Sequence, residues 1–238
     1  MYTLYIANKY YSSWSLRPWI LMKECGIPFE ERLVPFEHAE NLKLFKAYAP
    51  NAQMPCLHDD DLVIWDSLGI VQYLAERHEN VWPQEARARA WAQSATAEIH
   101  SSFFALRHLC PVNCGLRVAL HTIPAAAARD IERIDEIWRD GLDRFAGPFL
   151  AGSSFTAVDA FYAPVCFRIQ TYGLPFSPQA MAYNRRMLDR PAMLDWYQAG
   201  LREPYRESHR DREPRNSGTV TADYRVSDRR NEAPANPA

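Results

Sequence analysis

The stretch MYTLYIANKYYSSWSLRPWILMKECGIPFEERLV, residues 1–34, decides the first half of the fold. Residues 3–7 are apolar and β-prone, which is typical of a short buried strand. A helix is then expected to begin at Ser13 or Ser15 and to end at Gly26 and Pro28. Residues 29–34 form a second strand candidate, so the order β-α-β predicts a parallel crossover unit.

The next segment adds an antiparallel hairpin and a helix. A polar, partly helical connection over 37–50 leads to strand candidates at 55–58 and 62–65. Three consecutive aspartates between these strands favour a tight turn. Ser67 begins a helix that runs to about residue 78. The order β-α-β, connection, β-β-α predicts a thioredoxin-like domain over residues 1–80.

The second half of the chain shows helical periodicity throughout. Apolar residues recur every three or four positions over 91–106 and again over 131–145, which predicts two long amphipathic helices. A third, almost wholly apolar helix is expected over 156–170, followed by short helices at 178–188 and 191–201. These patterns predict an all-α domain over residues 84–202.

The last segment, residues 203–238, has a different composition. It is rich in Arg, Pro, Asp and Asn, and its only aromatic residues are Tyr205 and Tyr224. Such a segment buries too little apolar surface to offset its ordering entropy, so we expect a disordered tail.

Overall composition excludes several classes of protein. With 47% hydrophobic residues the chain can form a substantial core, and a net charge of −2 gives no reason to expect nucleic acid or a membrane surface as partner. No apolar run is long enough to span a bilayer, and the first residues do not resemble a signal peptide. We therefore expect a cytoplasmic protein whose five cysteines are reduced.

Three short motifs in the first half could bind a peptide-like ligand. Gln53-Met54-Pro55 enters the third strand, where a cis bond would turn the Met54 backbone outward to pair with an extended peptide. Asp66-Ser67 lies at a strand-to-helix junction. Ser67 as N-cap, with free N–H groups beside it, could hold a carboxylate, and Asp66 could hold an ammonium.

The third motif, Tyr11-Ser12-Ser13-Trp14-Ser15, follows the first strand. Its hydroxyls lie at a helix N-terminus, where the dipole favours an anion and lowers the pKa of a thiol. One serine is enough for a cap, so three indicate a site. A further motif, Thr156 to Asp159, is a capping box with a structural role in the helical half.

Taken together and in this order, the motifs resemble those of the glutathione transferase superfamily over residues 2 to 202. The SSWS-x-R stretch is similar to the SSCS-x-R motif of the serine-type zeta class, with Trp14 in place of the cysteine. The resemblance implies an α/β thioredoxin-like domain followed by an all-α helical domain. It also implies a homodimer, and glutathione as co-substrate with no permanently bound cofactor.

The resemblance implies roles for individual residues. Ser12 is expected to be the catalytic serine, with Ser13 and Ser15 beside glutathione, and Met54 at Pro55 is expected to pair with the cysteinyl backbone. Asp66 and Ser67 would hold the γ-glutamyl end. Ala52 stands where Lys or Arg is common in the family, so Gln53 is expected to supply part of the contact to the glycyl carboxylate.

The electrophilic acceptor is expected between the two domains. Its candidate lining residues are Tyr10, Tyr11, Phe103, Phe104, Arg107 and His108. Core packing remains the alternative for the aromatic residues, and surface exposure for His108. Cys110 and Cys114, with three histidines nearby, match no common zinc pattern, so no metal is expected.

Three functions remain open at this point. The first is conjugation of a glutathione thiolate, activated by Ser12, to a small electrophile. The second is an isomerase of the maleylacetoacetate type, or a dehalogenase, that uses the same thiolate. The third is a non-catalytic binding or scaffold protein that keeps the fold.

Overall fold

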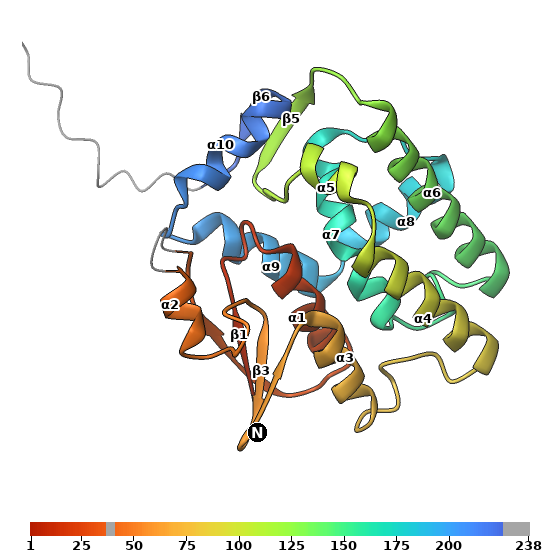
Figure 1. Cartoon of the computed structure of the whole chain (residues 1–238). Helices are drawn as coiled ribbons and strands as arrows, with labels where there is room; N and C mark the ends of the chain where they lie inside the picture. The colour runs from red at the N-terminus through yellow and green to blue at the C-terminus, as the bar shows by residue number, and fades with distance from the viewer. Residues whose placement is uncertain (37–40, 226–238) are drawn as a thin grey trace, which may run out of the picture.

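The computed structural model of the chain describes residues 1–36 and 41–225 (Figure 1). The N-terminal half contains a four-stranded mixed sheet with the strand order β2-β1-β3-β4. β1 (Tyr2–Ile6) pairs in parallel with β2 (Phe29–Leu33) and antiparallel with β3 (Cys56–Asp59), which pairs antiparallel with β4 (Leu62–Trp65). The predicted thioredoxin-like order is therefore confirmed.

Alternation along β1 directs its side chains to two separate cores. Leu4 and Ile6 pack with α1 (Ser13–Glu24) and α3 (Ser67–Ala75) in the main core of the protein. Ala7, just after β1, belongs to a smaller cluster on the other face, which also includes Phe45 of α2 (Asn41–Lys46). The two faces of the sheet are thus covered by different helices.

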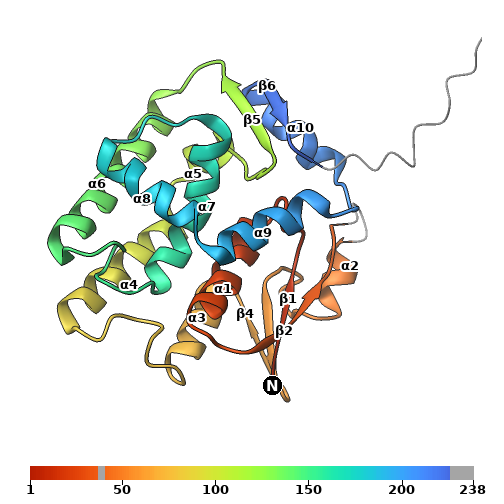
Figure 2. The same ribbon diagram turned by 180° about the vertical axis from the view of Figure 1, so that it is seen from behind.

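The second half is built around one buried helix. α7 (Ala157–Tyr172) is buried along almost its whole length and contacts α1, α4 (Ala86–Ser101) and α8 (Pro178–Leu188). α9 (Pro191–Arg202) returns to the N-terminal half (Figure 2). There the rings of Trp196 and Trp19 lie 5.0 Å apart. The helices of the second half therefore pack directly on α1.

The helix predicted over 91–106 is broken. α4 ends at Ser101, Phe103 has a left-handed backbone with φ of 64°, and α5 (Phe104–Leu109) then starts in a new direction. The periodicity correctly predicted helical structure on both sides of Phe103, but the break there changes which side chains of α5 face inward.

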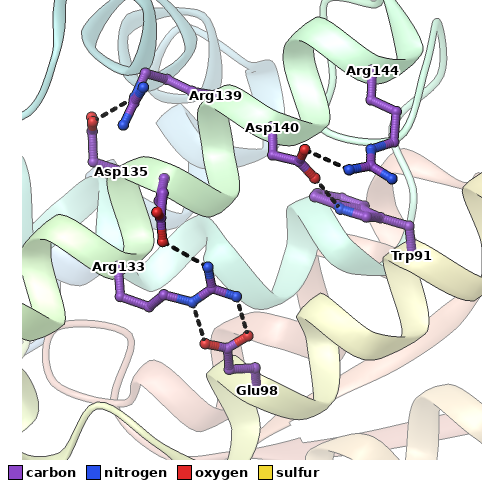
Figure 3. A network of polar contacts seen from close by, with 8 residues as sticks. Trp91, Glu98, Arg133, Asp135, Arg139, Asp140 and Arg144 are labelled. Carbon is purple, nitrogen blue, oxygen red and sulfur yellow. Dashed lines mark hydrogen bonds and ion pairs between the residues drawn. The ribbon is translucent and has the colours of Figure 1, made fainter.

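The second long helix, α6 (Ala125–Phe145), is held against α4 by polar contacts as well as by its apolar side (Figure 3). The Arg133 guanidinium makes two hydrogen bonds to the Glu98 carboxylate, at 2.8 and 3.0 Å. Trp91 Nε1 donates to Asp140 Oδ2 at 2.7 Å. These contacts fix the pairing of two helices that line the outer side of the helical half.

The predicted helical second half is confirmed, although it contains one strand, and the prediction of a disordered tail is wrong for residues 203–225. β5 (Leu116–Leu120) pairs antiparallel with β6 (Gly218–Asp223), and α10 (Ser208–Ser217) precedes β6 (Figure 1). The composition of this segment obscured a strand whose partner lies about a hundred residues earlier in the chain. Residues 226–238 of the predicted tail lie outside the described residues.

The predicted capping box at the start of α7 is present. Asp159 accepts hydrogen bonds from the backbone N–H groups of Thr156 and Leu150 and from the Tyr183 hydroxyl, each at 3.0 Å. The carboxylate is fully buried. It therefore joins the start of α7 to the preceding loop and to α8.

We expect Asp159→Ala to lower the free energy of unfolding by about 3 kcal/mol, because it leaves three buried donors unpaired and removes a cap. Urea denaturation would measure the change. Asp195→Ala, at an exposed position of α9, is the matched control and should change stability by less than about 0.5 kcal/mol. Equal effects of the two substitutions would contradict the role given to Asp159.

Candidate active site

A cavity of about 580 Å³ lies between the two halves of the molecule. The thioredoxin-like half contributes residues from the start of α1, the segment before β3 and the start of α3. The helical half contributes residues from α4, α5 and α7, and the C-terminal segment contributes two from α10. The predicted site residues that line it are Tyr11, Ser12, Ser13, Gln53, Met54, Pro55, Asp66, Ser67 and Arg107.

Ser12 is the N-cap of α1 and faces this cavity. Its Oγ accepts from the Ser15 N–H at 3.2 Å and donates to Ser15 Oγ at 2.8 Å. Ser15 Oγ in turn accepts from the Ala7 N–H at 3.1 Å. Because a hydroxyl can rotate, Ser15 is able to donate to Ser12 instead, which would release the Ser12 proton toward a ligand.

The resemblance implied that Ser15 lies beside glutathione, but Ser15 is fully buried and does not line the cavity. One turn separates it from Ser12 on α1, so its side chain lies behind Ser12, beneath the loop that follows β1. The structure thus places Ser15 as a support for Ser12.

The Met54–Pro55 bond is cis, as the motif suggested, and both residues line the cavity. Gln53 and Ala52 precede them on the cavity wall. Beyond this segment, toward α2, the rings of Phe36 and Phe45 form an apolar part of the wall, with their centroids 5.7 Å apart.

At the start of α3, Asp66 and not Ser67 is the N-cap. Asp66 Oδ1 accepts from the backbone N–H of Leu68 at 2.7 Å and more distantly from Gly69 at 3.4 Å. The Ser67 hydroxyl is buried, lines the cavity, and has no hydrogen-bond partner among residues 1–36 and 41–225. An unpaired buried hydroxyl at a cavity wall indicates a place where a ligand can bind.

His100, at the end of α4, lies beside Asp66, with Nε2 3.7 Å from Oδ1. Burial lowers the pKa of His100, and the nearby Asp66 carboxylate acts in the opposite direction. Its neighbours in the sequence carry no sign that this histidine reaches the cavity, because α4 belongs to the other domain.

Two arginines make the helical side of the cavity cationic. Arg107 donates to the carbonyls of Ile99 and Ser102, and Arg168 Nε donates to the carbonyl of Cys110 at 2.8 Å. Burial lowers the pKa of both, that of Arg168 to about 10, which leaves Arg168 charged at neutral pH. No carboxylate forms an ion pair with either of them within the described ranges.

Four of the predicted acceptor residues do not line the cavity. Tyr10 is buried on the other side of the loop, where its ring lies close to Gly115, and Phe103 is buried in the core. Phe104 is 73% exposed and His108 is also exposed. The break at Phe103 is the physical reason, because it turns positions 104 and 108 of α5 to the solvent and leaves Arg107 beside the cavity.

The loop between β1 and α1 is fixed by a residue of the predicted tail. Glu203 is buried and accepts from the backbone N–H of Lys9 at 2.8 Å and, more weakly, from that of Tyr10 at 3.4 Å. Lys9 Nζ pairs with Glu31 at 2.6 Å. These contacts hold the backbone that leads to Ser12.

The C-terminal segment reaches the cavity as well. Tyr11 donates through its hydroxyl to Asp211 Oδ1 at 2.8 Å, and burial raises the pKa of Tyr11, so this phenol stays protonated. Arg210 and Glu213 of α10 line the cavity. Neither could be predicted from local sequence, since the whole segment appeared too polar to fold.

Comparison with known proteins agrees with this geometry. Residues 11–77 match the family model for the glutathione S-transferase N-terminal domain, and residues 117–199 match that for the glutathione S-transferase C-terminal domain. The chain belongs to the glutathione transferase superfamily. Both models stop short of Glu203, α10 and β6.

Individual relatives support the same assignment. Glutathione S-transferase GstB of Escherichia coli K12 is 26% identical over 205 residues, which is 78% of this chain and 86% of that protein. Human glutathione S-transferase theta-1 is 27% identical over 164 residues, or 62% of this chain and 67% of the human protein. The predicted enzyme class, a glutathione transferase, is confirmed by these relatives.

Solved structures confirm the fold. A glutathione transferase homolog from Burkholderia, determined with bound glutathione, superimposes with a TM-score of 0.63 at 23% identity. The match covers 84% of this chain and 97% of that one. A theta class enzyme from Xanthomonas axonopodis, also with glutathione bound, gives a TM-score of 0.60 at 24% identity, over 84% of this chain and 96% of that one.

Residues 1–36 and 41–225 contain no group of three or more His, Cys, Asp or Glu side chains placed to hold a metal ion. None of their helices combines the length and the apolar character needed to cross a membrane.

We expect Ser12→Ala to lower the free energy of unfolding by about 1 kcal/mol, because α1 loses its N-cap. Ser13→Ala, which removes the neighbouring hydroxyl outside the cap, is the matched control and should have a smaller effect. Chemical denaturation of both variants measures the difference. A Ser13→Ala loss as large as that of Ser12→Ala would show that the cap is not the stabilising contact.

Proposed function

We propose that this protein conjugates glutathione to a small electrophile and that the Ser12 hydroxyl stabilises the glutathione thiolate. The proposal rests on one observation, which is that Ser12, Met54 and the unpaired Ser67 hydroxyl line the same cavity. Each comes from a different element of the thioredoxin-like half, and each matches one chemical group of a cysteine-containing tripeptide.

The thiol would bind at the start of α1. There the Ser12 hydroxyl donates to the sulfur while Ser15 donates to Ser12, and the helix dipole adds a favourable field. A thiol pKa lowered by one to two units corresponds to roughly 1.4–2.7 kcal/mol of preference for the thiolate. Ser12 is then a hydrogen-bond donor, and the sulfur is the nucleophile.

The rest of glutathione would extend from this point along the wall of the cavity. Met54 pairs with the cysteinyl backbone, and Gln53 follows on the glycyl side. The γ-glutamyl carboxylate takes the Ser67 hydroxyl as a donor, and its ammonium is held by Asp66. Asp66 uses Oδ1 to cap α3, which leaves Oδ2 for the ligand.

The electrophile would bind on the helical side of the thiolate. The residues of the cavity lining that we expect to contact the electrophile are Trp14, Tyr11 and Arg107. The Arg107 guanidinium lies 4.9 Å from the Trp14 ring centroid, so this side combines an aromatic surface with positive charge. The thiolate attacks the electrophilic carbon, the new bond is a thioether, and the leaving group departs with the electron pair.

The serine-type, zeta-like subclass and the homodimer belong to this proposal too. The same thiolate could instead serve as a temporary nucleophile in a cis-trans isomerase or a dehalogenase. The third possibility is a non-catalytic member that keeps the binding site. The hydrogen bond between Ser12 and Ser15 at the start of α1 supports the transferase over the non-catalytic protein.

Removing the Ser12 hydroxyl should reduce conjugation at least tenfold while glutathione still binds. We expect kcat/KM of Ser12→Ala with an aryl halide to fall, and its rise with pH to move upward by one to two pH units, because the thiol pKa is no longer lowered. The pH–rate profile measures both effects.

Two variants serve as controls for this experiment. Ser12→Thr keeps a hydroxyl and should retain more activity than Ser12→Ala, and Ser13→Ala should leave the pH profile in place. An unchanged pH profile in Ser12→Ala would remove Ser12 from the catalytic role.

A second experiment separates the three functions. We expect the protein to be retained on a glutathione-affinity column and to conjugate an aryl halide. Retention without conjugation, but with turnover of a maleyl compound or a haloalkane, would favour the isomerase or dehalogenase. Failure to be retained would favour the non-catalytic protein.

A further inference from the structure

The expected position of the glycyl carboxylate of glutathione follows from the positions proposed for its thiol, its γ-glutamyl end and its cysteinyl backbone. This inference rests on the proposed function, in which the thiol lies at Ser12, the γ-glutamyl end at Ser67 and the cysteinyl backbone at Met54. An extended tripeptide then places its glycyl carboxylate beyond Met54, on the side away from α3. That part of the wall is formed by Phe36, Phe45 and residues 51–53.

This end of the cavity has a shortage of positive charge. Among the described residues of the thioredoxin-like half that line it, none is Lys or Arg, and Ala52 stands immediately before Gln53. A carboxylate next to apolar rings is poorly placed unless a charged donor offsets its loss of hydration. The thioredoxin-like half alone therefore gives the glycyl carboxylate only neutral partners.

The C-terminal segment brings a cation to this place. The Arg210 guanidinium lies over the Phe36 ring, 4.1 Å from the centroid, and Arg210 lines the same cavity. Across residues 1–36 and 41–225, no carboxylate forms an ion pair with it. Stacking on Phe36 holds the plane of the guanidinium, while its edge remains able to donate.

The helix that carries Arg210 is held in place from several directions. Asp211, the next residue, accepts from the Tyr11 hydroxyl at 2.8 Å and pairs with Arg225 at 2.9 Å. The strand that follows the helix pairs with β5. Arg210 is thus positioned by the loop that precedes Ser12 and by the helical half together.

One acidic side chain lies nearby. Glu213 lines the cavity one turn after Arg210, and its carboxylate is 3.5 Å from His209 Nδ1. Its repulsion of a ligand carboxylate makes a cation at Arg210 more important.

We propose that Arg210 binds the glycyl carboxylate of glutathione, so that a segment outside both matched family domains completes the glutathione site. A guanidinium can donate two parallel hydrogen bonds to a carboxylate, which gives both charge and orientation. α10 then acts as the wall of the site at its glycyl end.

The test compares two ligands that differ only at the glycyl carboxylate. Glutathione and its ethyl ester at the glycyl carboxylate would be titrated calorimetrically into the full chain and into Arg210→Gln. We expect the unaltered protein to prefer glutathione over the ester by about tenfold, because a charge-assisted contact is lost in the ester. In Arg210→Gln this preference should fall to about twofold or less, mainly through weaker binding of glutathione.

Arg212→Gln is the matched control, since it removes the same charge from an exposed position of α10. It should keep the tenfold preference. If Arg210→Gln keeps this preference, or weakens both ligands equally, the assignment of Arg210 is overturned and the proposed function stands. If the unaltered protein binds neither ligand, the proposed function itself fails, and the assignment fails with it.

Discussion

The site depends on how the backbone between β1 and α1 is held. This loop has to leave a buried strand, turn, and begin a helix with Ser12 facing the cavity. Its N–H groups at Lys9 and Tyr10 are bound by Glu203, and the Ala7 N–H is bound by Ser15. A loop that is buried and satisfied on both sides has little freedom to move, so the Ser12 hydroxyl is presented in a fixed position.

The parts of the fold and site that could be predicted are those with local causes. The periodicity of strands and helices indicated the sheet order. The residues of the three predicted motifs, Ser12, Met54-Pro55 and Asp66-Ser67, all line one cavity. A cap, an X-Pro bond and a helix start act through neighbours within a few residues. Even there, the assignment of the cap to Ser67 was wrong, because the Asp66 side chain accepts from the backbone N–H groups of Leu68 and Gly69 and caps α3 itself.

The rest depended on contacts between distant segments. His100 and Arg168 reach the cavity only because α4 and α7 pack against the first domain, and their own neighbourhoods carry no sign of it. Phe104 and His108 do not line the cavity as predicted, because the helical pattern breaks at Phe103 and α5 turns both positions to the solvent. The fold of residues 208–223 depends on β5, so composition alone misjudged it.

The ribbon of β5 and β6 has a consequence for where this protein can be shortened. A chain cut after residue 202, at the boundary of the recognisable helical domain, would lose Glu203 and β6 together. β5 would then present an unpaired edge, which is a template for pairing with a second copy of the chain. Self-association of such a fragment would reflect the missing strand, and its oligomeric state would say nothing of the intact protein.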